Sequence, residues 1–159
     1  MLSARVAIRP ATSADLDAAW RVYRDAFGPL RAVYRPRGDV EAHERARAAL
    51  GSRLVAILDG EVVGTVQFEV HARHVHVIGL AVDPRHQRRG IGSLLVEGVA
   101  ALAPSLGHRV LALDTIRETG NVEVFERMGF RVTGERETPL FESDAFARLH
   151  EVLMERRLP

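Results

Sequence analysis

Residues 83–95 constrain the fold of this chain more than any other stretch, because they join an extended segment to a helix through a glycine-containing turn. They read Asp-Pro-Arg-His-Gln-Arg-Arg-Gly-Ile-Gly-Ser-Leu-Leu, after an apolar run that ends at Val82. Gly90 and Gly92 carry no Cβ, so their backbone N–H groups can approach a ligand closely. The first turn of a helix also has unpaired N–H groups and a partial positive charge. The stretch therefore predicts a strand–loop–helix unit with an anion site at the start of the helix.

Length and composition favour one globular domain over residues 1–159, with 47% hydrophobic residues and a net charge of +1. There is no cysteine, which excludes disulfides, thiolate zinc sites and a cysteine nucleophile. The charge balance gives no general attraction to nucleic acid or membrane. No apolar run is long enough to cross a bilayer, and the first residues lack the apolar core of a signal peptide. We expect a cytoplasmic protein.

Hydrophobic periodicity predicts alternating strands and helices along the rest of the chain. Expected strands cover residues 5–9, 54–58, 62–70, 74–82, 110–113, 130–135 and 151–157. Expected helices follow Thr12 and cover residues 39–50, 90–103 and 121–128. Asp59-Gly60 is a strong signal for a two-residue hairpin. Residues 138–149 read as loop or a helical turn.

In the first helix, an apolar stripe of Leu16, Trp20, Tyr23 and Phe27 recurs at helical period and is expected to pack on the sheet. Hairpins come first along the chain and a β-α-β crossover follows, with helices available for both faces. The order predicts an α+β (mixed α/β) fold: one central mixed, mostly antiparallel sheet flanked by helices on both faces.

Three segments together resemble the GNAT superfamily of acetyl-CoA-dependent N-acetyltransferases. Residues 8–16, beginning Ile-Arg-Pro-Ala-Thr, resemble its opening strand and helix. Leu80-Ala81-Val82-Asp83-Pro84, followed by Gln-Arg-Arg-Gly-Ile-Gly at 87–92, matches its acetyl-CoA signature Q/R-x-x-G-x-G/A. Residues 121–130, Asn-Val-Glu-Val-Phe-Glu-Arg-Met-Gly-Phe, resemble its later asparagine-to-Gly-Phe segment. Three matches in the right order are stronger than a glycine-rich fragment alone.

The resemblance implies how acetyl-CoA is held. Backbone groups of the strand end at Leu80, Ala81 and Val82 would bind the pantetheine arm as an extra strand does. The pyrophosphate would be held by the loop and helix start, namely Gln87, Arg88, Arg89, Gly90, Ile91, Gly92 and Ser93. Asn121 and Phe125 would contact the cofactor further along. The thioester would lie between this strand and the one that ends near Leu113, which splay apart in this family.

His76 is the first candidate for the base that deprotonates the acceptor amine. It lies four residues before Leu80, where many family members carry a catalytic glutamate. An imidazole can accept a proton near neutral pH. His74 shares its strand face by the period of two, and Glu69 on the neighbouring strand is a further candidate. The alternatives are that these are ordinary polar residues of a hairpin, or that water chains carry the proton.

The acid that protonates the thiolate is not evident from the sequence. A tyrosine commonly lies five residues before the Phe of Gly-Phe in this family, and here that residue is Phe125. A phenyl ring can pack against the cofactor but donates no proton. Water or another group would then supply the proton, or the protein binds acetyl-CoA and catalyses poorly.

Residues between the first two helices suggest an acceptor pocket. Tyr34 and Arg35 lie there with Arg31 and Arg37, and could favour an anionic acceptor, although a solvated charged loop explains them as well. Asp114, just past a buried strand, could orient the acceptor amine.

The sequence gives weaker indications of two other kinds of ligand, a metal ion and a nucleic acid. In His71-x-x-His74-x-His76, residues 74 and 76 would face together on one strand while residue 71 points to the other side. With no cysteine and no carboxylate at a matching spacing, we expect no metal. Arginines of the loop could also form a nucleic-acid patch, but no basic face or aromatic platform extends it.

The sequence therefore predicts an acetyl-CoA-dependent N-acetyltransferase that acts on a primary amine of a small molecule or peptide by direct attack. The alternative is a non-catalytic acyl-CoA-binding or regulatory module of the same fold. We expect no nucleic-acid or membrane partner, and a homodimer is compatible with the last strands.

Overall fold

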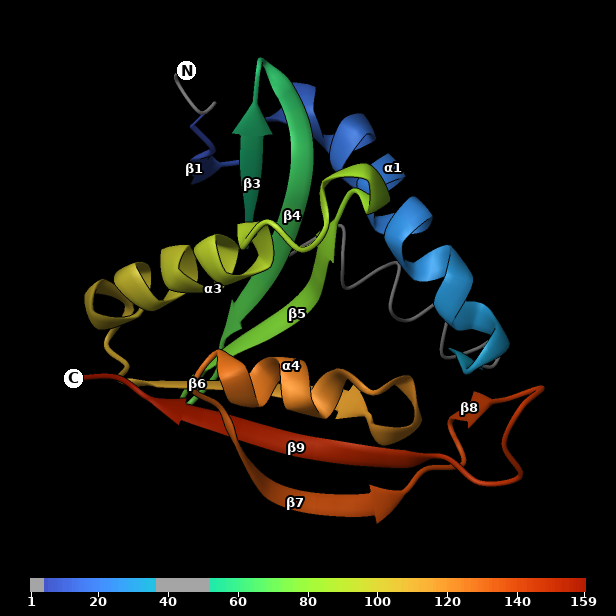
Figure 1. The fold of residues 1–159 in the computed structure, drawn as a ribbon. Coiled ribbons are helices and arrows are strands. Elements are labelled where there is room, and N and C mark those ends of the chain that lie inside the picture. Colours follow the sequence, from blue (N-terminus) through green and yellow to red (C-terminus); the bar gives the residue numbers. More distant parts are fainter. Residues whose placement is uncertain (1–4, 37–51) are drawn as a thin grey trace.

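The described residues build a seven-stranded sheet in the order β1-β3-β4-β5-β6-β9-β7, in which β5 and β6 run parallel and the other neighbours antiparallel (Figure 1). The computed structural model describes residues 5–36 and 52–159, so the helix expected over 39–50 and Arg37 lie outside the described residues. The strands are β1 (Ala7–Pro10), β3 (Ser52–Leu58), β4 (Glu61–Val70), β5 (Val75–Val82), β6 (Val110–Ile116), β7 (Arg131–Glu137) and β9 (His150–Arg157). The predicted mixed, mostly antiparallel sheet is confirmed.

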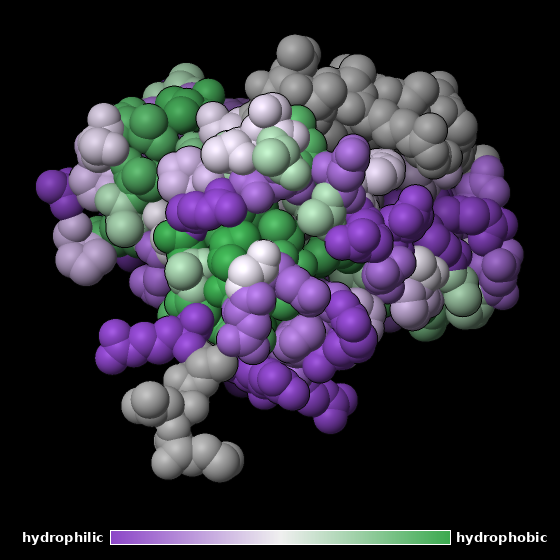
Figure 2. Space-filling model, turned by 90° about the horizontal axis from the view of Figure 1, so that it is seen from above, coloured by the Kyte–Doolittle hydropathy of each residue, from purple (hydrophilic) through white to green (hydrophobic). Residues whose placement is uncertain are grey.

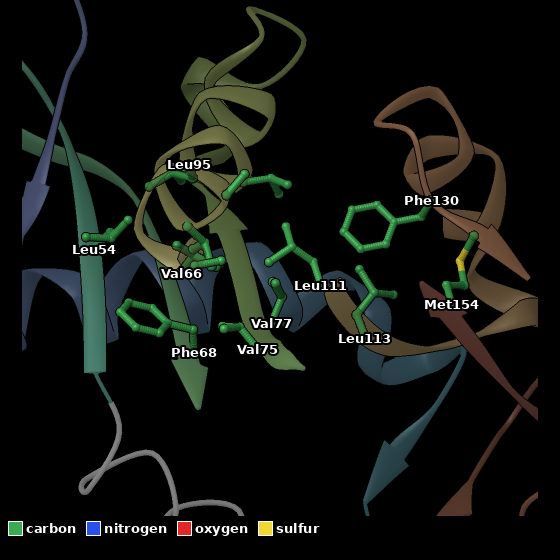
Figure 3. Packing of buried hydrophobic residues seen from close by; sticks show 14 of the residues in the cluster. Leu54, Val66, Phe68, Val75, Val77, Leu95, Leu111, Leu113, Phe130 and Met154 are labelled. Atoms are coloured by element: carbon green, nitrogen blue, oxygen red, sulfur yellow. The ribbon is translucent and has the colours of Figure 1, made fainter. Parts of the chain in front are cut away.

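Helices cover both faces of this sheet. Helix α1 (Leu16–Phe27) lies on one face, and α3 (Ile91–Leu102) and α4 (Asn121–Arg127) lie on the other (Figure 1). The hydrophobic core joins α3 to the strands beneath it, with Leu95, Val66, Val75 and Leu111 fully buried (Figure 3). Val75 and Val77 of β5 belong to this core, and because alternate residues of a strand point to opposite faces, His76 and Ile78 point to the other face of the sheet.

Local signals fix several connections as expected. Asp59 and Gly60 adopt φ values of 50° and 78°, which are the positive angles of a type I′ hairpin turn between β3 and β4. At the start of α1, Asp15 accepts hydrogen bonds from the Thr12 backbone N–H at 2.7 Å and from Arg9 at 2.6 Å. This carboxylate therefore joins β1 to the start of α1, and hydrogen bonds from Arg9 hold its pKa well below the ordinary value.

The predicted apolar stripe of α1 is wrong in part. Leu16 and Trp20 are 50% and 42% exposed, whereas Ala19 and Val22 are buried against the sheet. The small Ala19 lets the helix backbone approach the strands, which displaces the larger side chains to the flank. Tyr23 stays against the sheet beside Gly79 of β5, and its ring stacks on Trp20 with centroids 5.3 Å apart and on Phe27 at 4.4 Å.

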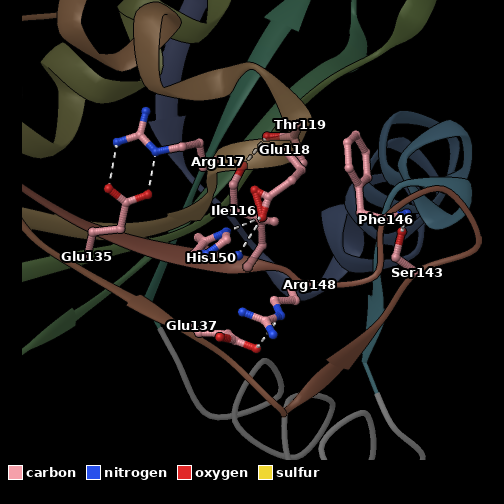
Figure 4. A network of polar contacts seen from close by, with 10 residues as sticks. All are labelled: Ile116, Arg117, Glu118, Thr119, Glu135, Glu137, Ser143, Phe146, Arg148 and His150. Atoms are coloured by element: carbon pink, nitrogen blue, oxygen red, sulfur yellow. Dashed lines mark hydrogen bonds and ion pairs between the residues drawn. The ribbon is translucent and has the colours of Figure 1, made fainter.

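The stretch that the sequence left open, residues 138–149, contains a short strand. Strand β8 (Phe141–Glu142) pairs antiparallel with β2 (Arg35–Pro36) in a two-stranded sheet. At the base of this excursion Glu118 accepts a hydrogen bond from the His150 backbone N–H, and Arg117 pairs with Glu135 (Figure 4). These contacts fasten the end of β6 to the strands β7 and β9.

Seen from above, hydrophobic and hydrophilic residues lie side by side on the surface, with hydrophilic residues along much of the margin (Figure 2). Such a mixture is ordinary, because apolar atoms supply more than half of the accessible surface of folded proteins. Among the described helices, none combines the length and the apolarity that a membrane span requires.

Candidate active site

Among the described residues, β5 and β6 pair at two positions near their starts, Val75 with Leu111 and His76 with Ala112. Beyond this point the two strands diverge, as Figure 1 shows. In the described part of the chain, residues 77–82 consequently have a strand partner only on the β4 side. Their other edge offers backbone N–H and C=O groups that an extended ligand could pair with.

A β-bulge interrupts β5 within this edge. Thr65 pairs with Ala81 and Gln67 with Ile78, so two residues of β5, Gly79 and Leu80, lie opposite one residue of β4. Gly79 has a φ of 60°, and a Cβ there would lie 3.4 Å from the ring of Tyr23. The bulge thus needs a glycine for its backbone angle, and it bends β5 beside the diverging edge. The sequence-based prediction missed Gly79, although an isolated glycine in a strand pattern is a known signal for a bulge.

The loop between β5 and α3 is held by its own polar side chains. The Asp83 carboxylate accepts hydrogen bonds from the Arg85 backbone N–H at 2.9 Å and from its guanidinium at 2.9 Å. The side-chain bond from Arg85 lowers the pKa of Asp83, although its burial acts in the opposite direction. Gln87 donates to the Val82 carbonyl at 3.0 Å and so ties the loop back to the strand end.

We call residues 87–92 the glycine loop. Arg88 and Gly90 have φ values of 63° and 79°, so the backbone turns twice through the left-handed region before α3 begins. Arg88, Arg89 and Gly90 are exposed, while Ile91 is 2% exposed and anchors the helix start in the core. A Cβ at Gly90 would meet no atom within 4 Å, so its side of the loop is open to a ligand.

Helix α4 lies beside the start of α3. A Cβ at Gly92 would lie 3.5 Å from Met128 and 3.8 Å from Val82, which shows how closely α4, β5 and α3 meet there. Phe125 packs edge-to-face on the buried Phe130, with centroids 6.1 Å apart, and is itself only partly buried. Asn121 is the first residue of α4, and its backbone N–H bonds the Thr119 hydroxyl at 3.3 Å.

At the other end of β5, three imidazoles gather into what we call the histidine cluster: His71, His74 and His76. His74 Nε2 lies 3.2 Å from His76 Nδ1, and the ring of His71 stacks on that of His74 with centroids 4.9 Å apart. Burial, and after it the neighbouring His71, lower the pKa of His74, which favours the neutral form of this imidazole. Glu69 pairs with His76 in register across the two strands.

The expectation that His71 points away from His74 is wrong. The His71 N–H bonds the His74 carbonyl at 2.9 Å across the turn formed by Ala72 and Arg73. Residues that face each other across such a turn point to the same side of a hairpin, whereas simple alternation treats residues 71–76 as one strand. Two carboxylates also lie near the histidine cluster: Glu69 Oε2 is 3.4 Å from His71 Nε2, and Asp114 Oδ2 is 3.9 Å from His76 Nε2.

Residues predicted to bind the acceptor fall into two places. Asp114 lies beside His76, on the strand that diverges from β5. Arg35 lies on β2, where it pairs with Glu142 at 3.6 Å and with Asp144 at 2.9 Å. Tyr34 packs edge-to-face on Phe141 with centroids 5.5 Å apart. Tyr34 and Arg35 thus dock β8 onto β2, and their role toward an acceptor stays a prediction.

Comparison with known proteins matches this geometry. A model of the acetyltransferase (GNAT) family matches residues 11–130. The L-amino acid N-acetyltransferase AaaT of Escherichia coli is 32% identical over an alignment of 92 positions, which covers 52% of this chain and 54% of that protein. The peptidyl-lysine N-acetyltransferase YjaB of Salmonella typhimurium is 39% identical over 62 residues, 39% of this chain and 40% of that protein. The chain therefore spans about half, or less, of the length of these relatives.

Solved structures share the fold over nearly the whole chain. The ribosomal-protein-S18-alanine N-acetyltransferase of Escherichia coli superposes with a TM-score of 0.76 at 18% identity, covering 97% of this chain and 94% of that one. A GNAT family acetyltransferase of Elizabethkingia anophelis, solved with acetyl-CoA bound, gives 0.70 at 19% identity, with coverage of 96% and 98%. Together with the family model over residues 11–130, the divergent strands and the glycine loop, this places the chain in the GNAT family of acetyltransferases.

Proposed function

We propose that this protein is an acetyl-CoA-dependent N-acetyltransferase that acts on a primary amine of a small molecule or peptide. The divergence of β5 from β6 carries the proposal, because it leaves the backbone of residues 77–82 available beside an exposed glycine loop. Both features fit the two chemical halves of acetyl-CoA, an amide-bearing arm and a pyrophosphate. Bound there, acetyl-CoA would supply an activated acetyl group as a thioester.

Each half of the site uses the backbone. Backbone groups of Leu80 and Val82 would pair with the amides of the pantetheine arm, as an added strand does. The N–H groups of the first turn of α3, preceded by the left-handed Arg88 and Gly90, would hold the pyrophosphate. The guanidinium groups of Arg88 and Arg89 would add charge-assisted hydrogen bonds.

His76 is proposed as the base. Its ring lies on β5 at the last pair with β6, where the two strands begin to diverge. Asp114 Oδ2 lies 3.9 Å from its Nε2 and would stabilise the imidazolium that forms when His76 takes a proton from the attacking amine. His74 Nε2 lies 3.2 Å from His76 Nδ1 and can exchange a hydrogen bond with it, and burial, which lowers the pKa of His74, disfavours a second positive charge there.

The chemical class of the acceptor can be inferred from two relatives. One of them is named for L-amino acids and the other for peptidyl-lysine, and both groups are primary amines. We infer the same class of acceptor here. Carboxylates that surround the histidine cluster, Glu69 and Asp114, would attract a cationic amine to this end of β5.

The test is the release of free CoA from acetyl-CoA with a panel of L-amino acids, small amines and lysine-containing peptides. Turnover that depends on the amine and gives an N-acetylated product in the mass spectrum supports the proposal. The absence of product with every amine, while acetyl-CoA binds in calorimetry, would overturn it.

That second outcome describes the alternative function, a non-catalytic acyl-CoA sensor, and one observation favours it. Phe125 occupies the position where the family commonly carries a tyrosine, and its ring packs against Phe130 without any group that could donate a proton. A sensor needs the cofactor site but no acid, so binding without turnover would identify it.

A further inference from the structure

We propose that His71, His74 and His76 bind a divalent transition-metal ion of the kind that prefers imidazole, such as Zn²⁺. The three side chains each offer one ring nitrogen, and these atoms all lie within 4.8 Å of one another. All three are half-buried, so they are accessible to an ion and yet positioned by the hairpin. Imidazole nitrogens favour Zn²⁺, Ni²⁺ and Cu²⁺ over Mg²⁺ or Ca²⁺.

The spacing of two of the nitrogens already suits a metal. In a tetrahedral site with Zn–N bonds of about 2.0–2.1 Å, neighbouring donor atoms lie about 3.3 Å apart. His74 Nε2 and His76 Nδ1 are separated by 3.2 Å. An ion between them would take the place of the proton in this hydrogen bond, and that proton would move to the other nitrogen of the same ring. His71 would complete the set by turning its ring out of the stack on His74.

Two carboxylates lie beside the ring nitrogens that would not bind the ion. If His76 binds through Nδ1, its Nε2 remains directed at Asp114 Oδ2, 3.9 Å away. His71 Nε2 likewise lies 3.4 Å from Glu69 Oε2, so Nδ1 can serve the ion. Metal-bound histidines usually donate their other ring N–H to a carboxylate or carbonyl, which fixes the ring and strengthens the ligand. Two of the three histidines have this carboxylate in place.

The hairpin explains why the site can hold its shape. The backbone bond from His71 N–H to the His74 carbonyl closes the turn, and Glu69 and His76 face each other in register. Glu69, His71, His74 and His76 therefore project from one face of a paired backbone. Histidines that served only as solvated polar residues would not require this convergence on one point.

Calorimetric titration of the untagged, full-length protein with ZnCl₂ tests the site directly, in a buffer that does not chelate zinc. One Zn²⁺ per chain should bind, and MgCl₂ should give no heat of binding. His71→Ala and His74→Ala should weaken binding more than about 100-fold, because each removes a ligand, and Glu69→Gln should weaken it about 10-fold. The control is His150→Ala. The His150 ring pairs with Glu118 at the end of β9 that lies away from the histidine cluster, so this variant should bind zinc as the wild type does.

Absence of zinc binding, or equal binding by wild type and His71→Ala, would overturn the site. X-ray absorption of the zinc-loaded wild type is independent of any variant: three imidazole ligands support the proposal, and one or none overturns it. Activity gives a separate readout, which rests on the proposed function. Zinc that occupies His76 should inhibit acetyl transfer, and EDTA should restore it. Binding without inhibition would support the site and would overturn His76 as the base.

Discussion

At the carboxyl end of β5 the groups offered to a ligand belong to the backbone, whereas at its amino end they belong to side chains. The glycine loop and the free edge of residues 77–82 present N–H and C=O groups whose placement depends on two left-handed residues and one bulge. The histidine cluster instead presents three imidazoles and two carboxylates from β4, the turn, β5 and β6. A backbone site tolerates changes of side chain and suits a constant cofactor, whereas a side-chain site suits a particular acceptor and its proton.

The largest effect should come from the side-chain end. His76→Gln keeps a polar group of similar reach but removes the proton acceptor, so kcat/KM for the amine should fall about 10²–10⁴-fold, the usual contribution of general base catalysis. Steady-state assays with EDTA present, across a pH series, measure this effect. The acidic limb of the wild-type pH profile should also disappear in the variant.

Glu69→Gln is the matched comparison for that prediction. Glu69 faces His76 across the two strands and shares the same surface, but it is the weaker candidate for the base. We expect its kcat/KM to change less than about 10-fold, within the range of a single electrostatic neighbour. A variant pair in which Glu69→Gln loses activity and His76→Gln keeps it would reverse the assignment.

The next effect tests the backbone end. Gly90→Ala puts a Cβ on a residue with a φ of 79°, where the side chain costs about 1–2 kcal/mol of backbone strain. The new methyl group or the altered loop should weaken acetyl-CoA binding about 100-fold, equivalent to roughly 2.7 kcal/mol. Affinity measured by calorimetry and stability measured by thermal unfolding separate the two contributions.

Gly107→Ala is the control, because Gly107 has a φ of 87° and ends the helical segment after α3. A Cβ at Gly107 would likewise meet no atom within 4 Å. The loss of stability should resemble that of Gly90→Ala, with acetyl-CoA affinity unchanged. Equal loss of affinity in both variants would mean that global destabilisation, rather than the glycine loop, explains the effect.

The same contrast accounts for what could be predicted from the sequence. The glycine loop is contiguous, and its chemistry follows from residue types that permit particular backbone angles, so residues 83–95 predicted the strand, the turn and the helix that the structure contains. The two-residue turn at Asp59-Gly60 followed from the same rule. Local backbone preferences are encoded locally.

Side-chain neighbours from separate elements were harder to predict. The position of His71 depends on which residues pair across a turn, and Asp114 reaches His76 only because β5 and β6 pair for two residues before they diverge. Arg35 meets Glu142 through a strand pair that no periodicity indicated. In α1 the buried residues were the small Ala19 and Val22, because close approach to the sheet outweighed the size of Trp20.

A smaller effect is expected at Phe125, where the family commonly carries a tyrosine that can donate a proton. Phe125→Tyr adds a hydroxyl at the edge of a partly buried ring, beside the site proposed for the cofactor. If protonation of the leaving thiolate limits turnover, kcat should rise by up to about 10-fold, below the usual range for an optimally placed acid. Phe125→Leu, which keeps the apolar contact without a hydroxyl, should not raise kcat. An equal kcat in all three proteins would show that this position takes no part in proton transfer.

The smallest effect concerns the ion pair between Asp83 and Arg85, which lies just before the glycine loop. Asp83→Asn keeps an acceptor for the Arg85 backbone N–H but loses the charge that pairs with the guanidinium, so the free energy of unfolding at pH 7 should fall by about 0.5–1 kcal/mol. Because the pKa of Asp83 is lowered in the folded state, the wild type holds this stability above the ordinary carboxyl pKa and loses it as the pH falls through the folded value. Denaturant unfolding at pH 7 and at pH 3 should therefore show a difference in free energy of unfolding between wild type and variant that becomes smaller in acid.

Asp59→Asn is the control, because Asn-Gly is equally favourable in its turn. Its free energy of unfolding should differ little from that of the wild type at both pH values. If the difference in free energy of unfolding between wild type and Asp83→Asn stays constant with pH, the carboxylate acts through its hydrogen-bond geometry alone. The charge of Asp83 would then contribute nothing to the stability of the loop at the carboxyl end of β5.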